Sequence, residues 1–277
     1  LEQNLRWPDL RGGQEKDILK ARLETYNLSV THLLNFLDLT KGGPEYFKQR
    51  NLLNLPEVKS ASLSYGTAIH AAMDAAQKLT NRRAFSLAKV SAEFQAALRA
   101  EQLPAEQYKR YSSQGKRELL RLFKDLGYKL PKGSPSEQKF RDVMVGQARL
   151  GGKLDRVDNN GERISIIDYK TGRPLKSFDT NDKSLQLKAY KHKLQLVFYS
   201  LLLGEQNLPV EGQMVYVEAQ NQRELLRTYQ PTPEDIQRLK RMISVIWPMI
   251  INLNLPDTSA YSPDFDGIKS FEADLLK

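Results

Sequence analysis

Apolar residues in the first half of the chain recur every three or four positions, which is the spacing of amphipathic α-helices. The helices that this spacing predicts cover residues 16–39, 66–79, 87–101 and 105–126. Ser29 is a suitable N-cap for a second helix within the first of these segments, because its hydroxyl can accept a hydrogen bond from a backbone N–H. Gly42, Gly43 and Pro44 then interrupt the helical pattern. The first half of the chain is therefore predicted to be almost entirely helical.

The pattern changes from helical spacing to strand-like alternation after Pro131 and Pro135. Strands are predicted over residues 137–147, 149–158, 162–170, 211–218 and 223–230, and helices over residues 184–204 and 233–253. We expect residues 256–277 to form a loosely structured tail. The order of these elements predicts a mixed α/β domain built around one sheet, with helical additions in front of it.

An Asn-Gly pair at residues 160–161 predicts a tight turn between the second and third strands, because both residue types tolerate positive φ angles. With these two residues as the turn, Asp155 lies opposite Ile166. Asp168 is then its diagonal neighbour on the same face, with Cβ atoms ~7 Å apart. Lys170 shares that face, because side chains two positions apart on a strand point the same way. The predicted register therefore gathers two carboxylates and one ammonium on one side of the sheet.

Two carboxylates and a lysine on one sheet face can support hydrolysis of a phosphodiester bond. Such oxygen ligands suit a hard divalent cation, which acidifies a bound water and neutralises charge on a phosphate. The ammonium of Lys170 could position that water or stabilise the charge that develops during attack. The alternative is an ordinary salt bridge between Asp168 and Lys170 on a solvated sheet face. Against this alternative, the two residues end an otherwise apolar strand, where charges need compensation.

Composition narrows the classes of protein that remain. The 277 residues include 42 Lys and Arg, 33 Asp and Glu and no Cys, which gives a formal net charge of +9. The absence of Cys excludes disulfides, thiolate zinc sites, Cys-ligated iron–sulfur clusters and cysteine nucleophiles. No apolar run approaches the ~20 residues of a membrane span, and no Gly-x-x-x-x-Gly-Lys-Ser/Thr loop is present. We therefore expect no membrane partner and no bound nucleotide, and the positive charge points weakly to a polyanion such as nucleic acid.

The two strands around the predicted turn resemble the core of a known nuclease superfamily. Their sequences, Gly-Lys-Leu-Asp155-Arg-Val-Asp and Ile-Ile-Asp168-Tyr-Lys170-Thr-Gly, are similar to the motifs of the PD-(D/E)XK nuclease superfamily. More narrowly, they resemble the RecB-family nuclease domains found at the C-terminus of UvrD/Rep-like helicases. Residues 66–70, Gly-Thr-Ala-Ile-His, resemble the upstream histidine motif of that family, and residues 195–199, Gln-Leu-Val-Phe-Tyr, its downstream Gln-x-x-x-Tyr motif. All of these motifs occur in the order of the family.

This resemblance implies a restriction-endonuclease-like core, in which helices flank a central mixed β-sheet, with N-terminal helical additions. It implies a single nuclease domain over residues 1–277. Within that domain we expect an N-terminal helical segment over residues 1–60, a nuclease core over residues 61–255 and a C-terminal tail over residues 256–277.

The resemblance also implies roles for individual residues. The catalytic residues would be Lys170, Asp168 and Asp155. The metal ligands would be His70, Asp155, Asp168 and the backbone carbonyl of Tyr169, and the cofactor Mg²⁺ or Mn²⁺. The residues that would bind DNA or support the site are Gln195, Tyr199, Glu137, Thr171 and Arg173.

Several of these assignments have structural alternatives. His70 by itself could be an ordinary helix histidine, whereas His32 and His192 match no motif and are predicted to be structural or surface residues. Tyr199 could belong to the core. Residues 186–190 also fit the Gln-x-x-x-Tyr pattern, although the Leu-rich sequence that follows Tyr199 favours the later match.

Two groups of basic residues, one in a predicted helix and one after the third predicted strand, have two interpretations. Those within residues 109–124, together with Arg173 and Lys176, could form a DNA-facing surface or a solvated helix face. Some relatives bind an iron–sulfur cluster through a Cys-Pro-x-x-Phe stretch near the start. Residues 43–47 of this chain, Gly-Pro-Glu-Tyr-Phe, occupy that place without a cysteine, so we expect no iron–sulfur cluster.

Together, the residues and the resemblance predict a Mg²⁺- or Mn²⁺-dependent DNA nuclease, an exonuclease rather than an endonuclease. We expect it to act in DNA repair or recombination in the cytoplasm, with DNA as substrate and a helicase motor on the same polypeptide or in a complex. The sequence does not begin with Met, and we expect the working enzyme to be longer than 277 residues. The alternatives are a catalytically inactive DNA-binding scaffold of a helicase and a free-standing restriction or repair endonuclease.

Overall fold

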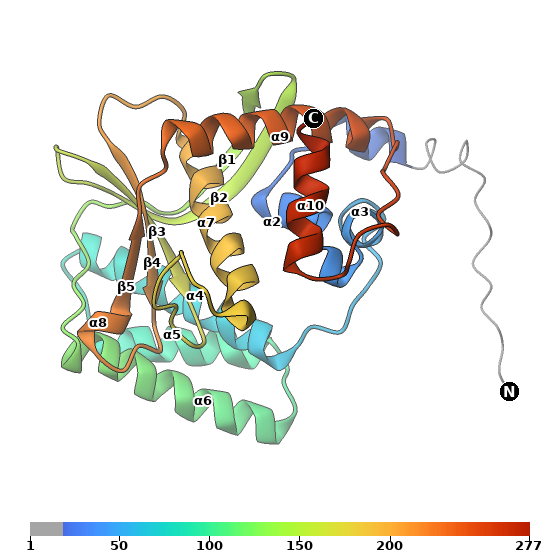
Figure 1. Cartoon of the computed structure of the whole chain (residues 1–277). Coiled ribbons are helices and arrows are strands. Elements are labelled where there is room, and N and C mark those ends of the chain that lie inside the picture. The colour runs from blue at the N-terminus through green and yellow to red at the C-terminus, as the bar shows by residue number, and fades with distance from the viewer. Residues whose placement is uncertain (1–18) are drawn as a thin grey trace, which may run out of the picture. The chain divides into compact units, whose positions relative to one another are not determined.

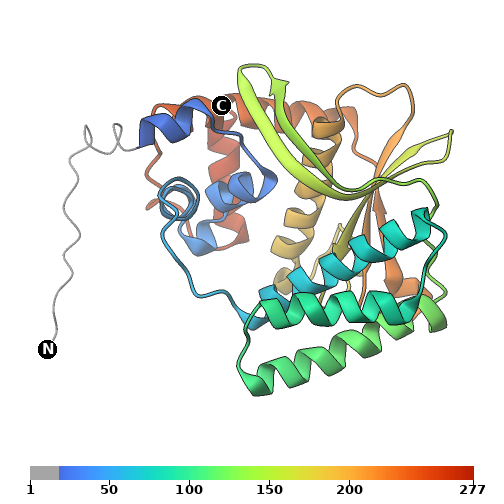
Figure 2. The same ribbon diagram turned by 180° about the vertical axis from the view of Figure 1, so that it is seen from behind.

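The computed structural model describes residues 19–277, and the chain divides into two compact units (Figures 1 and 2). The first, here called the helical unit, consists of Leu1–Pro56, Met144–Arg149 and Arg241–Lys277. The second, here called the sheet unit, consists of Glu57–Val143 and Leu150–Lys240. Every residue for which the sequence predicts a role in catalysis, metal binding or DNA binding lies in the sheet unit.

The sheet unit contains helices before, between and after its strands, in the order that the sequence predicts. Its helices are α4 (Ala61–Asn81), α5 (Leu87–Ala100), α6 (Ala105–Leu120), α7 (Lys183–Leu203) and α8 (Gln222–Leu225), and the π-helical segment η3 (Arg121–Asp125) continues α6. Its strands are β1 (Ser136–Val145), β2 (Ala148–Asn159), β3 (Ile164–Lys170), β4 (Val210–Tyr216) and β5 (Leu226–Tyr229), with the tip between β1 and β2 in the helical unit. Helix α9 (Pro233–Ile251) begins in this unit. The predicted elements agree with these within a few residues, except that the last predicted strand begins as the short helix α8.

The five strands form one mixed sheet in the order β1-β2-β3-β4-β5. Strand β3 pairs antiparallel with β2 and parallel with β4, and β4 pairs antiparallel with β5. The parallel pair requires a crossover, which α7 provides. Figures 1 and 2 show α7 on one side of the sheet and α4, α5 and α6 on the other. Helices therefore cover both faces of β3, and all of its residues except the last, Lys170, are buried.

The turn between β2 and β3 is longer than predicted, and this changes the register. Asn159 pairs with Ile164, so the loop contains four residues, 160–163, rather than two. The Asn160 side chain accepts hydrogen bonds from the backbone N–H groups of Glu162 and Arg163, which stabilises the longer loop. A shift of two residues keeps every side chain on its predicted face, because the period of a strand is two. The predicted face is confirmed, whereas the predicted pairing partners are wrong.

Glycine allows α7 to pack closely on the sheet. A Cβ atom added at Gly212 in β4 would lie 2.7 Å from the Cβ atom of Leu196 in α7, closer than real Cβ atoms approach. A Cβ atom at Gly152 in β2 would lie 2.7 Å from a methyl group of Leu202 in the same helix. At Gly212 the added atom would meet a Cβ atom, which cannot move without the helix, so only glycine there allows this approach of α7 to the sheet. At Gly152 it would meet the far end of a leucine side chain, which can shift.

The helical unit is built from short helices around aromatic side chains. After a helical stretch at residues 19–24, it contains α2 (Val30–Leu37), η1 (Leu39–Lys41), α3 (Gly43–Phe47), η2 (Lys48–Leu52), the end of α9 and α10 (Phe265–Leu275). Ser29 caps α2 as predicted, because its hydroxyl accepts a hydrogen bond from the backbone N–H of His32. Phe36 lies 5.6 Å from Phe47 and 6.3 Å from Phe271, measured between ring centroids, and all three side chains are buried.

The prediction of a loosely structured tail over residues 256–277 is wrong. Helix α10 lies within this segment and buries Ile268 and Phe271. Asp264 caps the helix by accepting a hydrogen bond from the backbone N–H of Gly267. Phe265, Ile268, Phe271 and Leu275 recur every three or four residues, so the sequence carries a helical period here that the prediction overlooked. Within residues 19–277, no helix combines the length and the apolar character that crossing a bilayer requires.

Candidate metal centre and active site

The two motif aspartates lie at the point where the pairing of β2 and β3 ends. The last paired residues are Arg156 and Ile167, and the same register continued by one residue places Asp155 directly opposite Asp168. The sequence predicts that these two carboxylates are diagonal neighbours, whereas the four-residue loop places them directly opposite each other. Both side chains are buried, with 8% of Asp155 and 2% of Asp168 exposed to solvent. The end of the ladder therefore brings two carboxylates together in a largely water-free position.

Asp155 takes the place of a backbone acceptor where the ladder ends. Its Oδ2 atom accepts a hydrogen bond of 2.9 Å from the backbone N–H of Tyr169. The same oxygen lies 3.1 Å from Nδ1 of His70, which α4 supplies from across the site. In an extended strand the N–H and C=O of one residue point to the same side, so the carbonyl of Tyr169 also faces Asp155. The structure thus brings His70, Asp155 and the backbone of Tyr169 together.

Asp168 is held by two partners that follow from the sequence motifs. Its Oδ1 atom accepts a hydrogen bond of 2.8 Å from Nε2 of Gln195, on α7. Its Oδ2 atom lies 2.8 Å from the Lys170 ammonium as an ion pair, but among the described residues it has no partner with hydrogen-bond geometry. A buried carboxylate oxygen without a hydrogen bond carries a desolvation cost that a further ligand would remove.

Gln195 connects the charged groups of the site. Its Oε1 atom accepts a hydrogen bond of 2.8 Å from Lys170, while its Nε2 atom donates to Asp168 and, at 2.6 Å, to the hydroxyl of Tyr199. Gln195 and Tyr199 lie one turn apart on the same face of α7, so both reach the site.

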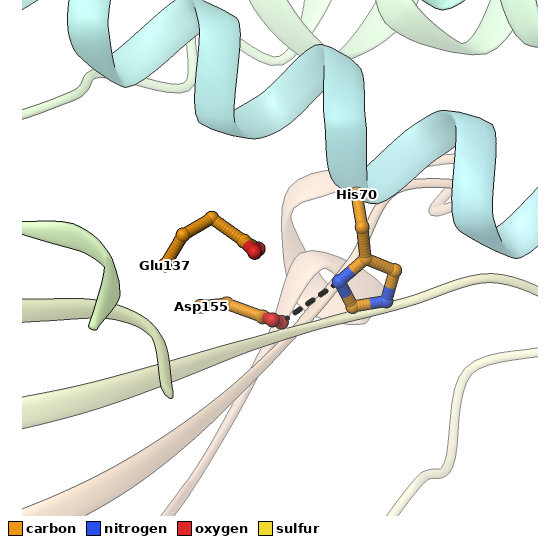
Figure 3. Close-up of side chains that lie close together, drawn as sticks. All are labelled: His70, Glu137 and Asp155. Carbon is orange, nitrogen blue, oxygen red and sulfur yellow. Dashed lines mark ion pairs between the residues drawn. The ribbon is translucent and has the colours of Figure 1, made fainter. Parts of the chain in front are cut away.

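Glu137 completes a possible metal-binding cluster from the first strand. One ligand atom from each of His70, Glu137 and Asp155 lies within 4.8 Å of the other two, and Figure 3 shows the three side chains pointing toward one another. Glu137 lies within β1, in agreement with the strand predicted over residues 137–147, and its φ of 55° is a left-handed value that non-glycine residues rarely adopt. Its carboxylate also pairs with the ammonium of Lys153. Such a strained position, held beside a charged cluster, is typical of a functional site.

Burial and the neighbouring charges shift the pKa values of the three titratable groups in this cluster. Burial raises the pKa of Asp168, and the charge of Asp155 adds to this effect against the attraction of Lys170. Burial also acts to raise the pKa of Asp155, but the hydrogen bond and charge of His70 outweigh it and lower that pKa. Burial would lower the pKa of His70, yet the hydrogen bond to Asp155 and the two carboxylate charges raise it on balance. Two facing carboxylates with opposite shifts are a pair that a bound cation would relieve.

The donor set fits a hard divalent cation. Two carboxylates and one imidazole, from Glu137, Asp155 and His70, are available within one cluster, and the unbonded Oδ2 of Asp168 offers a further ligand atom. Magnesium and manganese prefer such oxygen-rich sites, and the chain has no cysteine to favour a softer metal. The residues that would hold the ion are His70, Glu137, Asp155, Asp168 and the carbonyl of Tyr169.

Two predicted residues lie at the margin of this cluster. Thr171 follows Lys170 directly, is half-buried, and has its hydroxyl 3.6 Å from where a Cβ atom at Gly66 of α4 would lie. Arg173 is exposed, and its backbone carbonyl accepts a hydrogen bond from Lys188. The structure therefore places both residues beside the site, in the segment that leaves β3.

The sequence does not reveal the residues that support the site from behind. Arg156 is buried, binds both carboxylate oxygens of Asp158 at 2.8 Å and donates a hydrogen bond of 2.5 Å to the hydroxyl of Tyr169. Its guanidinium also lies 5.7 Å from the ring centroids of Tyr128 and Tyr169. Arg and Asp two positions apart on a strand share a face, and this spacing is the signal that could have identified the pair.

The remaining histidines contact aromatic residues instead of the carboxylate cluster. His32 in the helical unit has Nδ1 2.9 Å from the hydroxyl of Tyr26, and His192 on α7 has Nδ1 3.2 Å from the hydroxyl of Tyr216. These contacts agree with their prediction as structural residues.

Comparison with known proteins identifies one family. The sequence model of the PD-(D/E)XK nuclease superfamily matches residues 28–259, well over half of the chain. No curated protein matches the sequence. Among solved structures, a protein from Eubacterium rectale that is provisionally described as an exonuclease is 14% identical, covering 90% of this chain and 88% of its own, with a TM-score of 0.48. The protein SSO0001 is 18% identical, covering 76% of this chain and 88% of its own, with a TM-score of 0.29. Likenesses this distant do not specify an activity.

Proposed function

Because this chain belongs to the PD-(D/E)XK nuclease superfamily, we propose that it is a divalent-metal-dependent nuclease that hydrolyses phosphodiester bonds in DNA. The observation that carries the proposal is the pair of facing carboxylates, Asp155 and Asp168, with the Lys170 ammonium 2.8 Å from Asp168 Oδ2. A salt bridge on a solvated face, the alternative interpretation of Asp168 and Lys170, does not fit an aspartate that is 2% exposed.

Different residues of the site would hold the metal ion, position the attacking water and stabilise the transition state. When bound, Mg²⁺ or Mn²⁺ would acidify a coordinated water and neutralise charge on the scissile phosphate. His70, Glu137, Asp155, Asp168 and the carbonyl of Tyr169 would hold the ion. Lys170 would position the attacking water and stabilise the added negative charge of the transition state.

Gln195 sets the geometry of the catalytic lysine. By accepting from Lys170 and donating to Asp168, its amide fixes both groups relative to each other. Tyr199 accepts the second N–H of this amide and so fixes its orientation. Such positioning matters because a displacement of ~1 Å in a reacting group can reduce the rate about 100-fold.

A cleavage assay tests the proposal. The protein is incubated with end-labelled linear and circular DNA, single- and double-stranded, in Mg²⁺, Mn²⁺ or EDTA. We expect cleavage with either metal, none in EDTA, and none with Lys170→Ala or Asp168→Ala. Lys89→Ala removes the same charge from an exposed position on α5 and should cut at the wild-type rate. Circular dichroism and thermal melting would establish that the inactive variants remain folded.

The outcomes of this assay separate the alternatives. Cleavage by folded Lys170→Ala at the wild-type rate would contradict the assignment of the site. A wild-type protein that binds DNA but does not cut with either metal would instead be a binding scaffold. We propose an exonuclease, so linear DNA should be degraded from its ends and circular DNA should persist. Cleavage of circular DNA would support the endonuclease alternative.

The resemblance to RecB-family nuclease domains supports a wider part of the proposal. We infer that the nuclease works with a helicase motor, on the same polypeptide or in a complex, in DNA repair or recombination in the cytoplasm. Purification of the native protein should then recover an ATP-dependent helicase activity together with the nuclease. Recovery of nuclease alone, with no ATP-dependent unwinding, would argue for the free-standing enzyme.

A further inference from the structure

Among residues 19–277, the ammonium group of Lys188 on α7 forms no ion pair with an acidic side chain. Its Nζ atom donates a hydrogen bond of 2.5 Å to the backbone carbonyl of Arg173 and lies 5.8 Å from the ring centroid of Tyr216. Within residues 19–277 the structure gives it no carboxylate partner. The side chain is half-buried, so its position is fixed by these contacts and not by solvent alone.

The position of Lys188 on α7 places it in line with the catalytic groups. Residues 188, 192, 195 and 199 are spaced by four, three and four positions, so they share one face of the helix. Gln195 contacts Lys170 and Asp168, and His192 contacts the same Tyr216 that underlies Lys188. Lys188 therefore lies two helical turns, about 10.5 Å along the axis, from the residue that fixes the catalytic lysine.

Positive charge is concentrated at this end of the face. Burial lowers the pKa of Lys188, and the positive charges of Lys170 and Arg173 lower it further, while Glu218 acts weakly in the opposite sense. His192 contributes no charge at neutral pH, because burial together with Lys170 and Lys188 lowers its pKa to about 3. Three cationic side chains thus lie near one another, and Asp168 pairs with only one of them. Mutual repulsion of this kind is relieved when an anion binds between the cations.

The free donors of Lys188 suit a phosphate. An ammonium has three N–H donors, and the carbonyl of Arg173 uses one of them. The same hydrogen bond holds the segment that carries Arg173, whose own side chain is exposed beside it. A phosphate oxygen could therefore receive hydrogen bonds from Lys188 and a charge contact from Arg173.

We propose that Lys188, with Arg173, binds a backbone phosphate of the DNA strand within about three nucleotides of the scissile phosphate, because each strand of a duplex carries one phosphate per ~3.4 Å of helix axis. This inference rests on the proposed function, because it assigns the path of the same substrate away from the metal centre. Lys188 is a positioning residue: it holds the strand, and it does not touch the reacting atoms.

Salt-dependent DNA binding by matched variants tests the inference. Lys188→Met removes the ammonium but keeps a long apolar side chain over Tyr216, and Lys188→Arg keeps the charge. The control, Lys193→Met, removes a lysine from another face of the same helix, where Asp235 lies 3.5 Å away and the ring centroid of Tyr229 4.6 Å away. Binding of a fluorescent single-stranded oligonucleotide in EDTA is measured by anisotropy from 50 to 200 mM salt.

Loss of one phosphate contact has a defined signature. Each contact contributes a slope of ~0.7 to ~0.9 in log affinity against log salt concentration, so Lys188→Met should lose about one such unit. Over this fourfold salt range the wild-type affinity should fall about threefold more than the affinity of Lys188→Met. Lys188→Arg and Lys193→Met should keep the wild-type slope. In cleavage assays, KM of Lys188→Met should rise by a larger factor than kcat falls, because the lost contact holds substrate and transition state alike.

The possible results distinguish this inference from the proposed function. A wild-type protein that cuts DNA, together with a Lys188→Met slope equal to that of Lys193→Met, would overturn the inference alone. A wild-type protein that neither binds nor cuts DNA would overturn the proposed function and the inference with it. Calorimetric titration with inorganic phosphate provides the last arm. Loss of free-phosphate binding in Lys188→Met with an unaltered DNA slope would assign the site to a free anion and overturn the inference.

Discussion

At the scale of single residues, the site depends on one amide between two charges of opposite sign. Gln195 accepts from Lys170 through its oxygen and donates to Asp168 through its nitrogen. A carboxylate at this position would repel Asp168, and an ammonium would repel Lys170. Only a neutral side chain with both a donor and an acceptor satisfies the two partners at once.

Removing this amide should therefore affect both rate and stability. We expect Gln195→Leu to reduce kcat about 10- to 100-fold, because Lys170 loses the group that positions it. The free energy of unfolding should fall by about 1–3 kcal/mol, because the buried Asp168 loses a hydrogen-bond donor. Tyr199→Phe removes only a partner of the amide and serves as the control, with a change of about 1 kcal/mol or less. Equal losses in both variants, measured by urea unfolding and steady-state kinetics, would contradict this role of Gln195.

The crowded carboxylates predict that metal binding stabilises the fold. A ligand that binds only the folded state at 100 times its dissociation constant adds about 2.7 kcal/mol to the free energy of unfolding. We expect Mn²⁺ or Mg²⁺ to raise the melting temperature of the wild-type protein in differential scanning fluorimetry. Asp155→Asn, which neutralises the carboxylate between His70 and Tyr169, should lose most of this rise. A metal-independent melting temperature in the wild type would count against the proposed ligand set.

At the scale of secondary-structure elements, sequence patterns predicted the face of each strand better than its partners. Alternation places Asp168 and Lys170 on one face, and the predicted turn adds Asp155 to it; the longer loop at residues 160–163 leaves that face intact because it shifts the register by two residues. The loop length itself depends on how the Asn160 side chain bonds the backbone, which a turn propensity does not specify. Local periodicity therefore determines orientation, and side-chain hydrogen bonds in the turn determine register.

The elements that sequence patterns missed are those that depend on tertiary packing. Helix α10 is short, although Phe265, Ile268, Phe271 and Leu275 have helical spacing, and the contact of Phe271 with Phe36, which is distant in sequence, helps to bury it. The left-handed backbone of Glu137 likewise has no local signal, since glutamate rarely adopts a positive φ. The resemblance implied only a supporting or DNA-binding role for Glu137, and its place in a cluster with His70 and Asp155 depends on how α4 crosses the sheet.

The close packing of α7 on β4 gives a prediction for this scale. In Gly212→Ala the new Cβ atom would lie 2.7 Å from Cβ of Leu196, the residue after Gln195. The helix must move, so we expect the free energy of unfolding to fall by about 1–3 kcal/mol and kcat to fall as well. Gly66→Ala is the matched control for stability. Its Cβ atom meets Thr171 at an ordinary 3.6 Å, and alanine is favoured over glycine within a helix.

The two substitutions should therefore have opposite signs in chemical denaturation. Gly66→Ala should leave the free energy of unfolding unchanged or raise it by up to about 1 kcal/mol. If Gly212→Ala is as stable and as active as the wild-type protein, α7 does not pack on β4 as closely as described.

At the scale of the whole molecule, each unit buries one histidine in neutral form. In the helical unit, burial and the charge of Arg22 lower the pKa of His32 to about 4. In the sheet unit, burial and the charges of Lys170 and Lys188 lower the pKa of His192 to about 3. The unfolded chain takes up a proton at each histidine near pH 6.5, whereas the folded units resist it. Stability from these groups is therefore fully present above pH 6.5 and is lost as the pH falls toward the folded pKa values.

This difference in histidine pKa between the folded and unfolded states predicts that the protein loses stability at mildly low pH. At pH 5, about 1.5 units below the pKa of histidine in the unfolded chain, protonation of His32 favours the unfolded state. The free energy of unfolding should therefore be about 2 kcal/mol lower at pH 5 than at pH 7. His32→Gln keeps a polar side chain near the hydroxyl of Tyr26 but does not titrate, so its stability should fall less between pH 7 and pH 5. His192→Gln should show the same effect in the sheet unit.

The difference between each variant and the wild type isolates one histidine, because His70, whose pKa is raised, is common to all three proteins. Thermal and urea unfolding at the two pH values measure this difference, and equal losses in the wild type and His32→Gln would show that His32 is not buried in neutral form.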